Sequence, residues 1–362
     1  MRNRRIFFER VPNSSIFIFI CTILLLKIIF YLLTKADVLN TSLGGGSDAN
    51  YYNSYAIGNI DVAVNTWPVI LRYFNNLGLY SREVFSFLLF SLNLITIPVL
   101  MTKLSNLKFK YSQKNYLYLF LLCSIYPTLF FFSVDVFRDV FMVFVFLLGC
   151  LSVKNCLNSS NILSFSFLLA ISFFISNLLF GLREYLGFAF FIALFLWKIR
   201  FTKKRLVFFT FLYFSALFIA NYLGFLDALT EYRSGFEEGD GGSTLGLSFS
   251  NPILFIPNFI LSTLGQLFGL YITNPFAIIL LILESTPFLF MLVYIVKNIK
   301  LADSFARFLI IFFVLYASVW LIGNDNLGTA VRLRLYNYLA VYICFFHILG
   351  LKKLASEKNR SL

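Results

Sequence analysis

The chain has few of the residues that bind transition metals or form redox centres. It contains one histidine, His347, and five cysteines, none of them spaced as a CxxC pair. Zinc sites and disulfide frameworks need such residues in close spacing, so the sequence argues against both. A magnesium ion held by carboxylates is still allowed.

Charged residues are also scarce, at 13% of the chain, whereas 59% of residues are hydrophobic and 20% are aromatic. The apolar residues form repeated runs of about 18 or more, the length that crosses a bilayer as a helix. No polar stretch is longer than residues 35–83, so we expect no separate soluble domain. The sequence predicts an all-α, polytopic integral membrane protein with a single domain over residues 1–362.

Short loops rich in Lys and Arg mark the inner side of a membrane. This rule places both termini inside and predicts outer loops at about 35–83 and 225–250. We expect about ten membrane-spanning helices, near residues 16–34, 84–102, 115–132, 136–153, 161–181, 185–199, 206–224, 275–297, 305–322 and 335–351.

Residues 252–273 are apolar enough to form a further span. If they crossed the membrane, Lys297 and Lys300 would lie outside, against the charge rule. The segment also contains Asn258 and Gln266. We therefore expect an outer interfacial or re-entrant helix, whose backbone must be covered by protein or line a polar cavity.

The predicted outer side carries most of the acidic residues, and its basic residues are arginines except for Lys35. The net charge of +13 comes largely from the inner loops, where it sets orientation and contacts anionic lipid headgroups, so no nucleic-acid partner is expected. A guanidinium is a planar donor group that suits phosphate oxygens. Arginines kept at several outer junctions therefore predict a phosphate or pyrophosphate ligand.

The first outer loop begins with a glycine-rich run that leads to Asp48, Tyr51 and Tyr52. Glycines let a backbone approach a ligand, and a carboxylate can act as a general base or coordinate a cation. A flexible surface loop is the alternative. Residues 51–74 are aromatic and look like an amphipathic element at the headgroup level, with sugar stacking as a second role.

Asp135, Arg138 and Asp139 are spaced by three and four residues. On a helix this spacing would place them on one face, at the outer N-terminal end of the predicted span 136–153. Unpaired backbone NH groups and the helix dipole favour an anion there. An internal Asp–Arg pair with a helix cap is the alternative, and it needs no ligand.

Two further junctions carry arginine. Arg183 and Glu184 join two predicted spans with almost no loop, and Arg332 and Arg334 precede the last span. Residues two apart on a helix point in nearly opposite directions, so one of Arg332 and Arg334 would face a site and the other the headgroups. In an extended segment both could face one side.

Other polar residues have simpler alternatives. Arg233 lies in the second outer loop near the acidic residues 237–240, where a functional lid competes with disorder. Glu284 is in the middle of a predicted span, where a carboxyl must be neutral or paired. We expect His347 to pack against a neighbouring helix.

Several of these segments resemble Wzy-type polysaccharide polymerases, including the EpsG-like branch, and the wider GT-C class of polytopic glycosyltransferases. The resemblance rests on a short first helix followed by Gly-Ser-Asp-Ala-Asn-Tyr-Tyr, on Phe-Arg-Asp at 137–139, on Arg-Glu-Tyr at 183–185 and on Gly-Thr-Ala-Val-Arg-Leu-Arg at 328–334. It implies a GT-C-like, multi-pass enzyme of the bacterial inner membrane. Such an enzyme joins lipid-linked oligosaccharide repeats of O-antigen or capsule at the periplasmic face, with undecaprenyl pyrophosphate as leaving group.

Under this resemblance Asp48 is the first candidate for the general base and Asp139 the second. The expected pyrophosphate-binding residues are Arg138, Arg183, Arg332, Arg334 and Arg233, and the supporting residues are Asp135, Glu184, Tyr51 and Tyr52. No cofactor or metal is expected. The expected partners are the lipid-linked oligosaccharide and membrane lipids, with a chain-length regulator and a flippase as candidates.

The second outer loop departs from the family pattern because Arg233 is its only arginine. This leaves open a GT-C transferase that moves a single sugar from a polyprenyl phosphate, with a divalent cation at Asp48. A lipid-oligosaccharide flippase or transporter is a second alternative. It would need polar residues through the membrane centre, where only Lys27 and Glu284 fit.

Overall fold

The computed structural model describes residues 11–36, 38–39, 46–236 and 243–358. These residues form helices, with an isolated bridge between Thr244 and Asn326 as the only β pairing. Eight of the described helices are long and apolar enough to cross a membrane: Asn13–Lys35, Arg82–Leu104, Arg138–Leu157, Ile162–Leu182, Lys203–Tyr222, Pro275–Lys297, Ser304–Gly323 and Leu327–Ala355. The protein is therefore an all-α, multi-pass membrane protein, as the sequence predicts.

The other two predicted spans are shorter helices. Residues 115–132 form α6 (Phe109–Ile125) and α7 (Pro127–Phe131), which are separated at Tyr126. Pro127 causes this break because it has no NH to donate to the preceding turn. The span predicted at 185–199 is α10 (Glu184–Leu196), a helix of 13 residues.

The chain folds as two compact units, Met1–Leu151 and Ser152–Leu362, and each is described by itself. A single domain over the whole chain stays a prediction.

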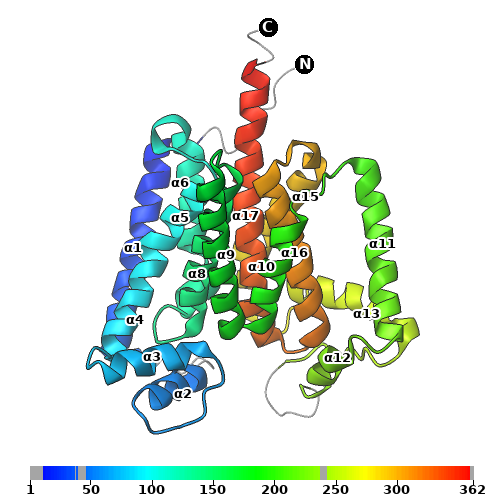
Figure 1. Cartoon of the computed structure of the whole chain (residues 1–362). Coiled ribbons are helices and arrows are strands. Elements are labelled where there is room, and N and C mark those ends of the chain that lie inside the picture. The colour runs from blue at the N-terminus through cyan, green and yellow to red at the C-terminus, as the bar shows by residue number, and fades with distance from the viewer. Residues whose placement is uncertain (1–10, 37, 40–45, 237–242, 359–362) are drawn as a thin grey trace. The chain divides into compact units, whose positions relative to one another are not determined.

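In the first unit, α1 (Asn13–Lys35) packs on α6. The segments α4 (Arg82–Ser91), η2 (Leu92–Thr96) and α5 (Ile97–Leu104) form one continuous helix, and α8 (Arg138–Leu157) follows α7. The predicted outer loop 35–83 is not irregular, because it contains α2 (Gly46–Ala56) and α3 (Thr66–Asn76). These two helices pack on each other and lie across the end of α4 (Figure 1).

Aromatic side chains hold the first unit together. Tyr31 of α1 stacks on Phe90 of α4 with ring centroids 4.2 Å apart. Trp67 of α3 is buried, packs on Phe141 and donates from Nε1 to the carbonyl of Val136 at 2.8 Å. The indole therefore fixes α3 against the segment that leads into α8.

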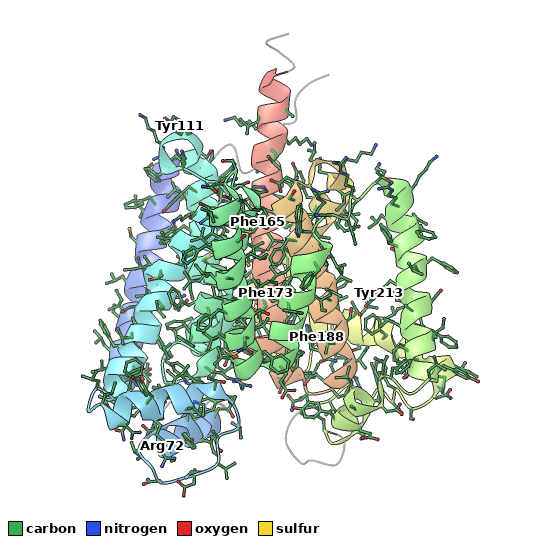
Figure 2. The ribbon with its side chains drawn as sticks, viewed as in Figure 1. Arg72, Tyr111, Phe165, Phe173, Phe188 and Tyr213 are labelled. Carbon is green, nitrogen blue, oxygen red and sulfur yellow. The ribbon has the colours of Figure 1, made fainter. Side chains whose placement is uncertain are left out.

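In the second unit, α9 (Ile162–Leu182) and α10 form an antiparallel hairpin, and α16 (Ser304–Gly323) packs between α10 and α17 (Leu327–Lys358). The segments α14 (Pro275–Leu280), η4 (Leu281–Ser285) and α15 (Thr286–Lys297) form one long helix that packs on α17. The helix α11 (Lys203–Tyr222) is attached more loosely. Its Tyr213 hydroxyl lies 2.6 Å from the Ser318 hydroxyl of α16 (Figure 2).

Residues 252–267 do not cross the second unit. They form α13 (Pro252–Ser262) and η3 (Thr263–Leu267), and α13 lies across α11 and α16 (Figure 1). Leu247, which precedes α13, and Asn324 both accept from the guanidinium of Arg233, while Gln266 of η3 also donates to Asn324. Both ends of this segment therefore lie at the same end of the unit. The helix in this segment is shorter than a membrane span, and its interfacial or re-entrant placement stays a prediction.

The wide π-helical turns η2 and η4 share a cause. Each is followed by one residue and then a proline, Pro98 and Pro287. A proline ring in a helix collides with the carbonyl four residues earlier. An extra residue in the preceding turn moves that carbonyl away from the proline ring. Such π-helical turns are frequent at functional sites.

Polar groups of the second unit collect at its two ends. At one end, Lys352 donates to Asn298 at 3.0 Å and His347 lies 2.8 Å from Asp303. Arg233 and Asp325 form an ion pair at the other end. The lysine-rich loops predicted to be inside thus separate from the arginine-bearing junctions predicted to be outside.

Candidate functional site

The polar end of the first unit is organised around Arg82 and Asp135. Arg82, at the start of α4, donates from Nε and Nη2 to the two carboxylate oxygens of Asp135, at 2.9 and 2.6 Å. Its Nη2 also donates to Asn50 of α2 at 2.8 Å. One guanidinium therefore links α2, α4 and the segment before α8.

Asp135 is held as a carboxylate. Burial alone would raise the pKa of its carboxyl, but the hydrogen bonds from Arg82 and from the backbone NH of Val136 outweigh burial and leave the pKa below its usual value. The Ser86 hydroxyl lies 3.4 Å from the same carboxylate. This arrangement suits a fixed anchor better than a proton-transfer group.

Tyrosines secure α2 and the chain around it. Tyr80 donates to Asn53 at 2.8 Å, and burial raises its pKa to about 12. Tyr52 is buried, and the Tyr51 hydroxyl donates to the carbonyl of Val62. Tyr51 and Tyr52 thus take part in contacts within the α2–α3 region, and their supporting role at a ligand site stays a prediction.

The predicted catalytic residues of this unit lie in different settings. Asp48 is half-buried in the first turn of α2, whereas Asp139 is 1% exposed in the first turn of α8. The expected common helical face of Asp135, Arg138 and Asp139 is wrong, because α8 begins only at Arg138. Of the preceding glycines, Gly44 and Gly45 lie outside the described residues.

Sequence reasoning missed Arg82 as the partner of Asp135. The residue is one of the arginines on the predicted outer side, and this is the only sequence signal that favoured it. Asp135 forms an Asp–Arg pair with a residue from another helix, Arg82.

Arg183 organises the polar end of the second unit. It is the single residue between α9 and α10 and has an extended backbone, with φ −159° and ψ 106°. Gly187 allows the two helices to approach closely, since a Cβ there would lie 2.2 Å from the backbone nitrogen of Phe180. The Ser176 hydroxyl also donates to the Gly187 carbonyl at 3.1 Å.

Tyrosines lie around Arg183, and this residue is 6% exposed. The guanidinium carbon lies 5.9 Å from the ring centroid of Tyr185, and that ring stacks on Tyr316 of α16 at 6.0 Å. Tyr316 meets the edge of Tyr336 of α17 at 5.6 Å and also interacts electrostatically with Arg183. We call Arg183, Tyr185, Tyr316 and Tyr336 the tyrosine–arginine cluster. Glu184 is exposed beside it.

The two arginines of α17 have different surroundings. The helix begins at Leu327, earlier than the expected start at 335, because the Asn326 side chain accepts from the backbone NH of Thr329 at 2.9 Å. Both arginines are therefore helical. Arg332 is half-buried and lies one turn before Tyr336, on the same face as the tyrosine–arginine cluster.

Arg334 faces another way and is buried. Its Nη2 lies 3.3 Å from the carboxylate of Glu284 in η4, which is fully buried. Tyr338 and Tyr342, at i+4 and i+8, donate to the carbonyls of Leu267 and Glu284 at 2.6 and 3.1 Å. This face of α17 is thus hydrogen-bonded to the π-turns η3 and η4. The Arg334–Glu284 ion pair therefore helps to hold α17 against η4.

Arg233 is also used inside its own unit. It is 1% exposed and donates to the carbonyls of Leu247, Leu321, Ile322 and Asn324 as well as to Asp325. Three of these carbonyls belong to the C-terminal end of α16 or follow it, where helix carbonyls lack partners. Arg233 therefore caps the C-terminal end of α16 and holds the second predicted outer loop against it. Its guanidinium contacts protein groups of this unit and is not part of the tyrosine–arginine cluster. The acidic residues 237–240 lie outside the described residues.

Within the described ranges no group of three or more His, Cys, Asp or Glu side chains is placed to hold a metal ion.

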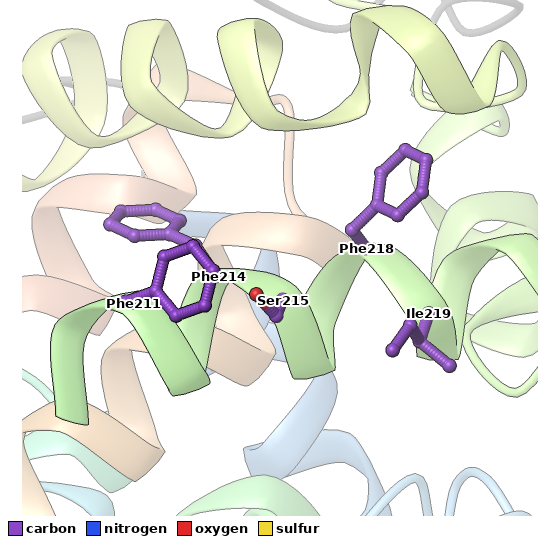
Figure 3. Close-up of a pocket in the computed structure, with 5 residues that line it drawn as sticks. All are labelled: Phe211, Phe214, Ser215, Phe218 and Ile219. Carbon is purple, nitrogen blue, oxygen red and sulfur yellow. The ribbon is translucent and has the colours of Figure 1, made fainter. Parts of the chain in front are cut away.

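A pocket of about 370 Å³ lies along one face of α11, lined by Phe211, Phe214, Ser215, Phe218 and Ile219 (Figure 3). It is apolar and suits a hydrocarbon chain.

No family model, curated protein or solved structure matches the chain. The tyrosine–arginine cluster and the Arg82–Asp135 region therefore have to be interpreted from their own chemistry.

Proposed function

We propose that the protein is a membrane glycosyltransferase. It polymerises undecaprenyl-pyrophosphate-linked oligosaccharide repeats of O-antigen or capsule at the periplasmic face of a bacterial inner membrane, with both termini in the cytoplasm. The proposal includes no cofactor. Its candidate partners are a flippase that supplies the repeats and a chain-length regulator.

The tyrosine–arginine cluster carries this proposal. Arg183 is a cation almost withdrawn from water at the junction of two apolar helices, and charged groups in such positions are costly and commonly functional. Arg332 lies on the face of α17 that meets the same tyrosines. Two guanidinium groups near one set of aromatic rings suit the oxygens of a diphosphate.

The reaction needs a base and a stabilised leaving group. An acceptor sugar hydroxyl attacks the anomeric carbon of the donor, and its proton passes to a carboxylate. The bond between that carbon and the pyrophosphate oxygen breaks, and the lipid pyrophosphate leaves with the electron pair. Arg183 and Arg332 stabilise the charge on that oxygen. Asp48 is favoured as base over Asp139 because it is half-buried rather than buried.

The test is a reconstitution in which the purified protein elongates lipid-linked repeats. Arg183→Lys and Arg332→Lys keep the charge but lose the planar donor pair, so we expect each to reduce elongation by at least about tenfold. Arg72→Lys is the control, since Arg72 lies in α3 and pairs with Asp61. Full elongation by Arg183→Lys would exclude the proposed role of this guanidinium.

One observation favours a second candidate, a lipid-oligosaccharide flippase. Glu284 and Arg334 are an ion pair inside spanning helices, as a transport pathway would require. A flippase moves lipid-linked repeats across proteoliposomes without lengthening them. Elongated products in the same assay would therefore reject it. A single-sugar GT-C transferase would instead leave full-length chains without a branch in a deletion strain, whereas loss of a polymerase leaves single capped repeats.

A further inference from the structure

We propose that Arg82 is the positioning residue for Asp48. It holds Asn50 of α2 and thereby orients the first turn of that helix, which carries the Asp48 carboxylate. The inference rests on the proposed function, because it takes Asp48 as the general base. It assigns a role to an arginine whose guanidinium acts through a neighbouring side chain and touches no reacting atom.

The guanidinium of Arg82 is itself fixed in direction. Its Nε and Nη2 donate to the two carboxylate oxygens of Asp135 at 2.9 and 2.6 Å, and that carboxylate accepts from the backbone NH of Val136 at 2.8 Å. Because a guanidinium is planar and rigid, two bonds to one carboxylate set the direction of its other hydrogens. The Nη2 group that donates to Asn50 at 2.8 Å therefore offers α2 a fixed point of attachment.

The helix α2 meets the rest of its unit along two stripes. One stripe is apolar and buried, and it consists of Ala49, Tyr52 and Ala56. Beside it, Asn50 accepts from Arg82, and one turn later Asn53 accepts from the hydroxyl of Tyr80 at 2.8 Å. Apolar contacts are non-directional, whereas hydrogen bonds have a preferred direction. The two asparagines therefore fix the rotation of α2 about its own axis.

The place of Asp48 depends on this rotation. Residues two apart on a helix point in nearly opposite directions, so Arg82 holds α2 from the side away from Asp48. A general base must lie within hydrogen-bond reach of the proton that it accepts. A displacement of about 1 Å can lower a rate by about a hundredfold. Loosening the first turn of α2 should therefore reduce the rate although Asp48 itself is intact.

The bond between Arg82 and Asn50 can be removed without dismantling the unit. Asn50 is exposed, and substitutions at exposed residues usually change stability little. The pair of Arg82 with Asp135 does not include Asn50. The bond from Tyr80 to Asn53 still holds the second turn of α2. Substitution of Asn50 therefore tests positioning separately from folding.

The experiment measures kcat and KM for elongation of lipid-linked repeats by the full-length protein. We expect Asn50→Ala to lower kcat at least about tenfold and to keep KM within about twofold, since it leaves Arg183 and Arg332 untouched. Asn50→Asp keeps an acceptor of the same shape for Arg82, so it should restore most of the kcat. Asn59→Ala is the matched control, because Asn59 is an exposed asparagine three residues beyond α2, and it should behave as the wild type does.

Hydrogen exchange of the same four proteins needs no turnover. In an α-helix the amides of Tyr51 and Tyr52 donate to carbonyls four residues earlier, so their exchange reports on the first turn of α2. We expect these amides to exchange at least about threefold faster in Asn50→Ala, as loss of one hydrogen bond predicts. Asn50→Asp and Asn59→Ala should leave the exchange unchanged, and the unfolding temperature should be the same in all four proteins.

Three results would overturn the inference. The first is full kcat in Asn50→Ala, and the second is an equal loss of kcat in Asn50→Asp. The third is unchanged exchange of Tyr51 and Tyr52 in Asn50→Ala, which would show that Arg82 does not hold the first turn. A lower unfolding temperature that accompanies the loss of kcat would assign the bond to folding instead.

Failure of the inference and failure of the proposed function look different. A polymerase that keeps its full rate in Asn50→Ala would reject the role of Arg82 alone. A wild-type protein that never elongates repeats would reject the proposed function and the role of Asp48 as base, whatever the exchange of α2 shows.

Discussion

Arg82 and Asp135 are joined by two hydrogen bonds although 53 residues separate them in the sequence. The pair is partly buried, with the two side chains 30% and 22% exposed. Arg72 and Asp61 form a second pair in the same unit, through one contact of 3.3 Å, and the side chain of Asp61 is 89% exposed. The first unit thus offers two Arg–Asp pairs that differ in geometry and burial.

We expect Arg82→Ala to lower the free energy of unfolding by about 2 kcal/mol, because it leaves a partly buried carboxylate without its two charged hydrogen bonds. Arg72→Ala should have a much smaller effect, since exposed ion pairs contribute little. Thermal and denaturant unfolding in detergent would measure both. Equal losses would show that the bidentate geometry of Arg82 adds nothing.

The same pair predicts a dependence on pH. In the folded protein the pKa of the Asp135 carboxyl is lower than its usual 3.8, so the unfolded chain binds this proton more readily. The stabilisation is therefore complete above about pH 5 and is lost as the pH falls through the folded pKa. The advantage of the wild type over Asp135→Asn in unfolding temperature should be constant between about pH 5 and 7 and shrink towards pH 3. An advantage that grows on acidification would contradict this sign.

Hydropathy predicted the all-α, multi-pass fold. These properties depend on local composition, because each membrane helix satisfies its own backbone hydrogen bonds. Two local features of the sequence also determine the helices. Asn326 is a helix cap that moves the start of α17 to Leu327, and Pro98 and Pro287 mark the π-turns before them.

Pairings between distant residues were not predictable in this way. Glu284 and Arg334 were each noticed in the sequence, but nothing in their spacing indicates that they meet across 50 residues. Arg233 was predicted to lie in a loop that could form a lid. Its guanidinium instead donates hydrogen bonds to the carbonyls at the C-terminal end of α16. A single sequence shows which residues are costly to bury, whereas tertiary packing decides which partner compensates each of them.

The Glu284–Arg334 pair allows a test by double substitution. Glu284→Leu or Arg334→Leu alone leaves a buried charge, so each should cost about 3–5 kcal/mol of unfolding free energy. The double variant removes both charges and should recover most of that loss. Unfolding of the four proteins in detergent gives the coupling free energy. Additive losses would mean that the two side chains do not compensate each other.

The two α17 arginines should also separate activity from stability. Arg332→Ala is expected to reduce elongation of lipid-linked repeats by about a hundredfold, as loss of a charged donor to a leaving group does, with a change in unfolding free energy below about 1 kcal/mol. Arg334→Leu should act mainly through stability. The pattern would be contradicted if Arg332→Ala unfolded as readily as Arg334→Leu.

The hairpin of α9 and α10 fixes Arg183, and a single methyl group tests this. In Gly187→Ala the new Cβ would lie 2.2 Å from the backbone nitrogen of Phe180 and 2.4 Å from its Cα, and these atoms cannot move without opening the hairpin. Overpacking of this kind costs about 1–3 kcal/mol, and it should displace Arg183 and lower diphosphate affinity as well. Gly350→Ala is the matched control, because a Cβ there meets no heavy atom within 4 Å and alanine favours a helix over glycine by about 1 kcal/mol. It should therefore leave affinity unchanged and stability equal or higher. If Gly187→Ala lost stability but kept full affinity, the close approach of the two helices would serve folding alone, and Arg183 would be positioned by its tyrosine neighbours.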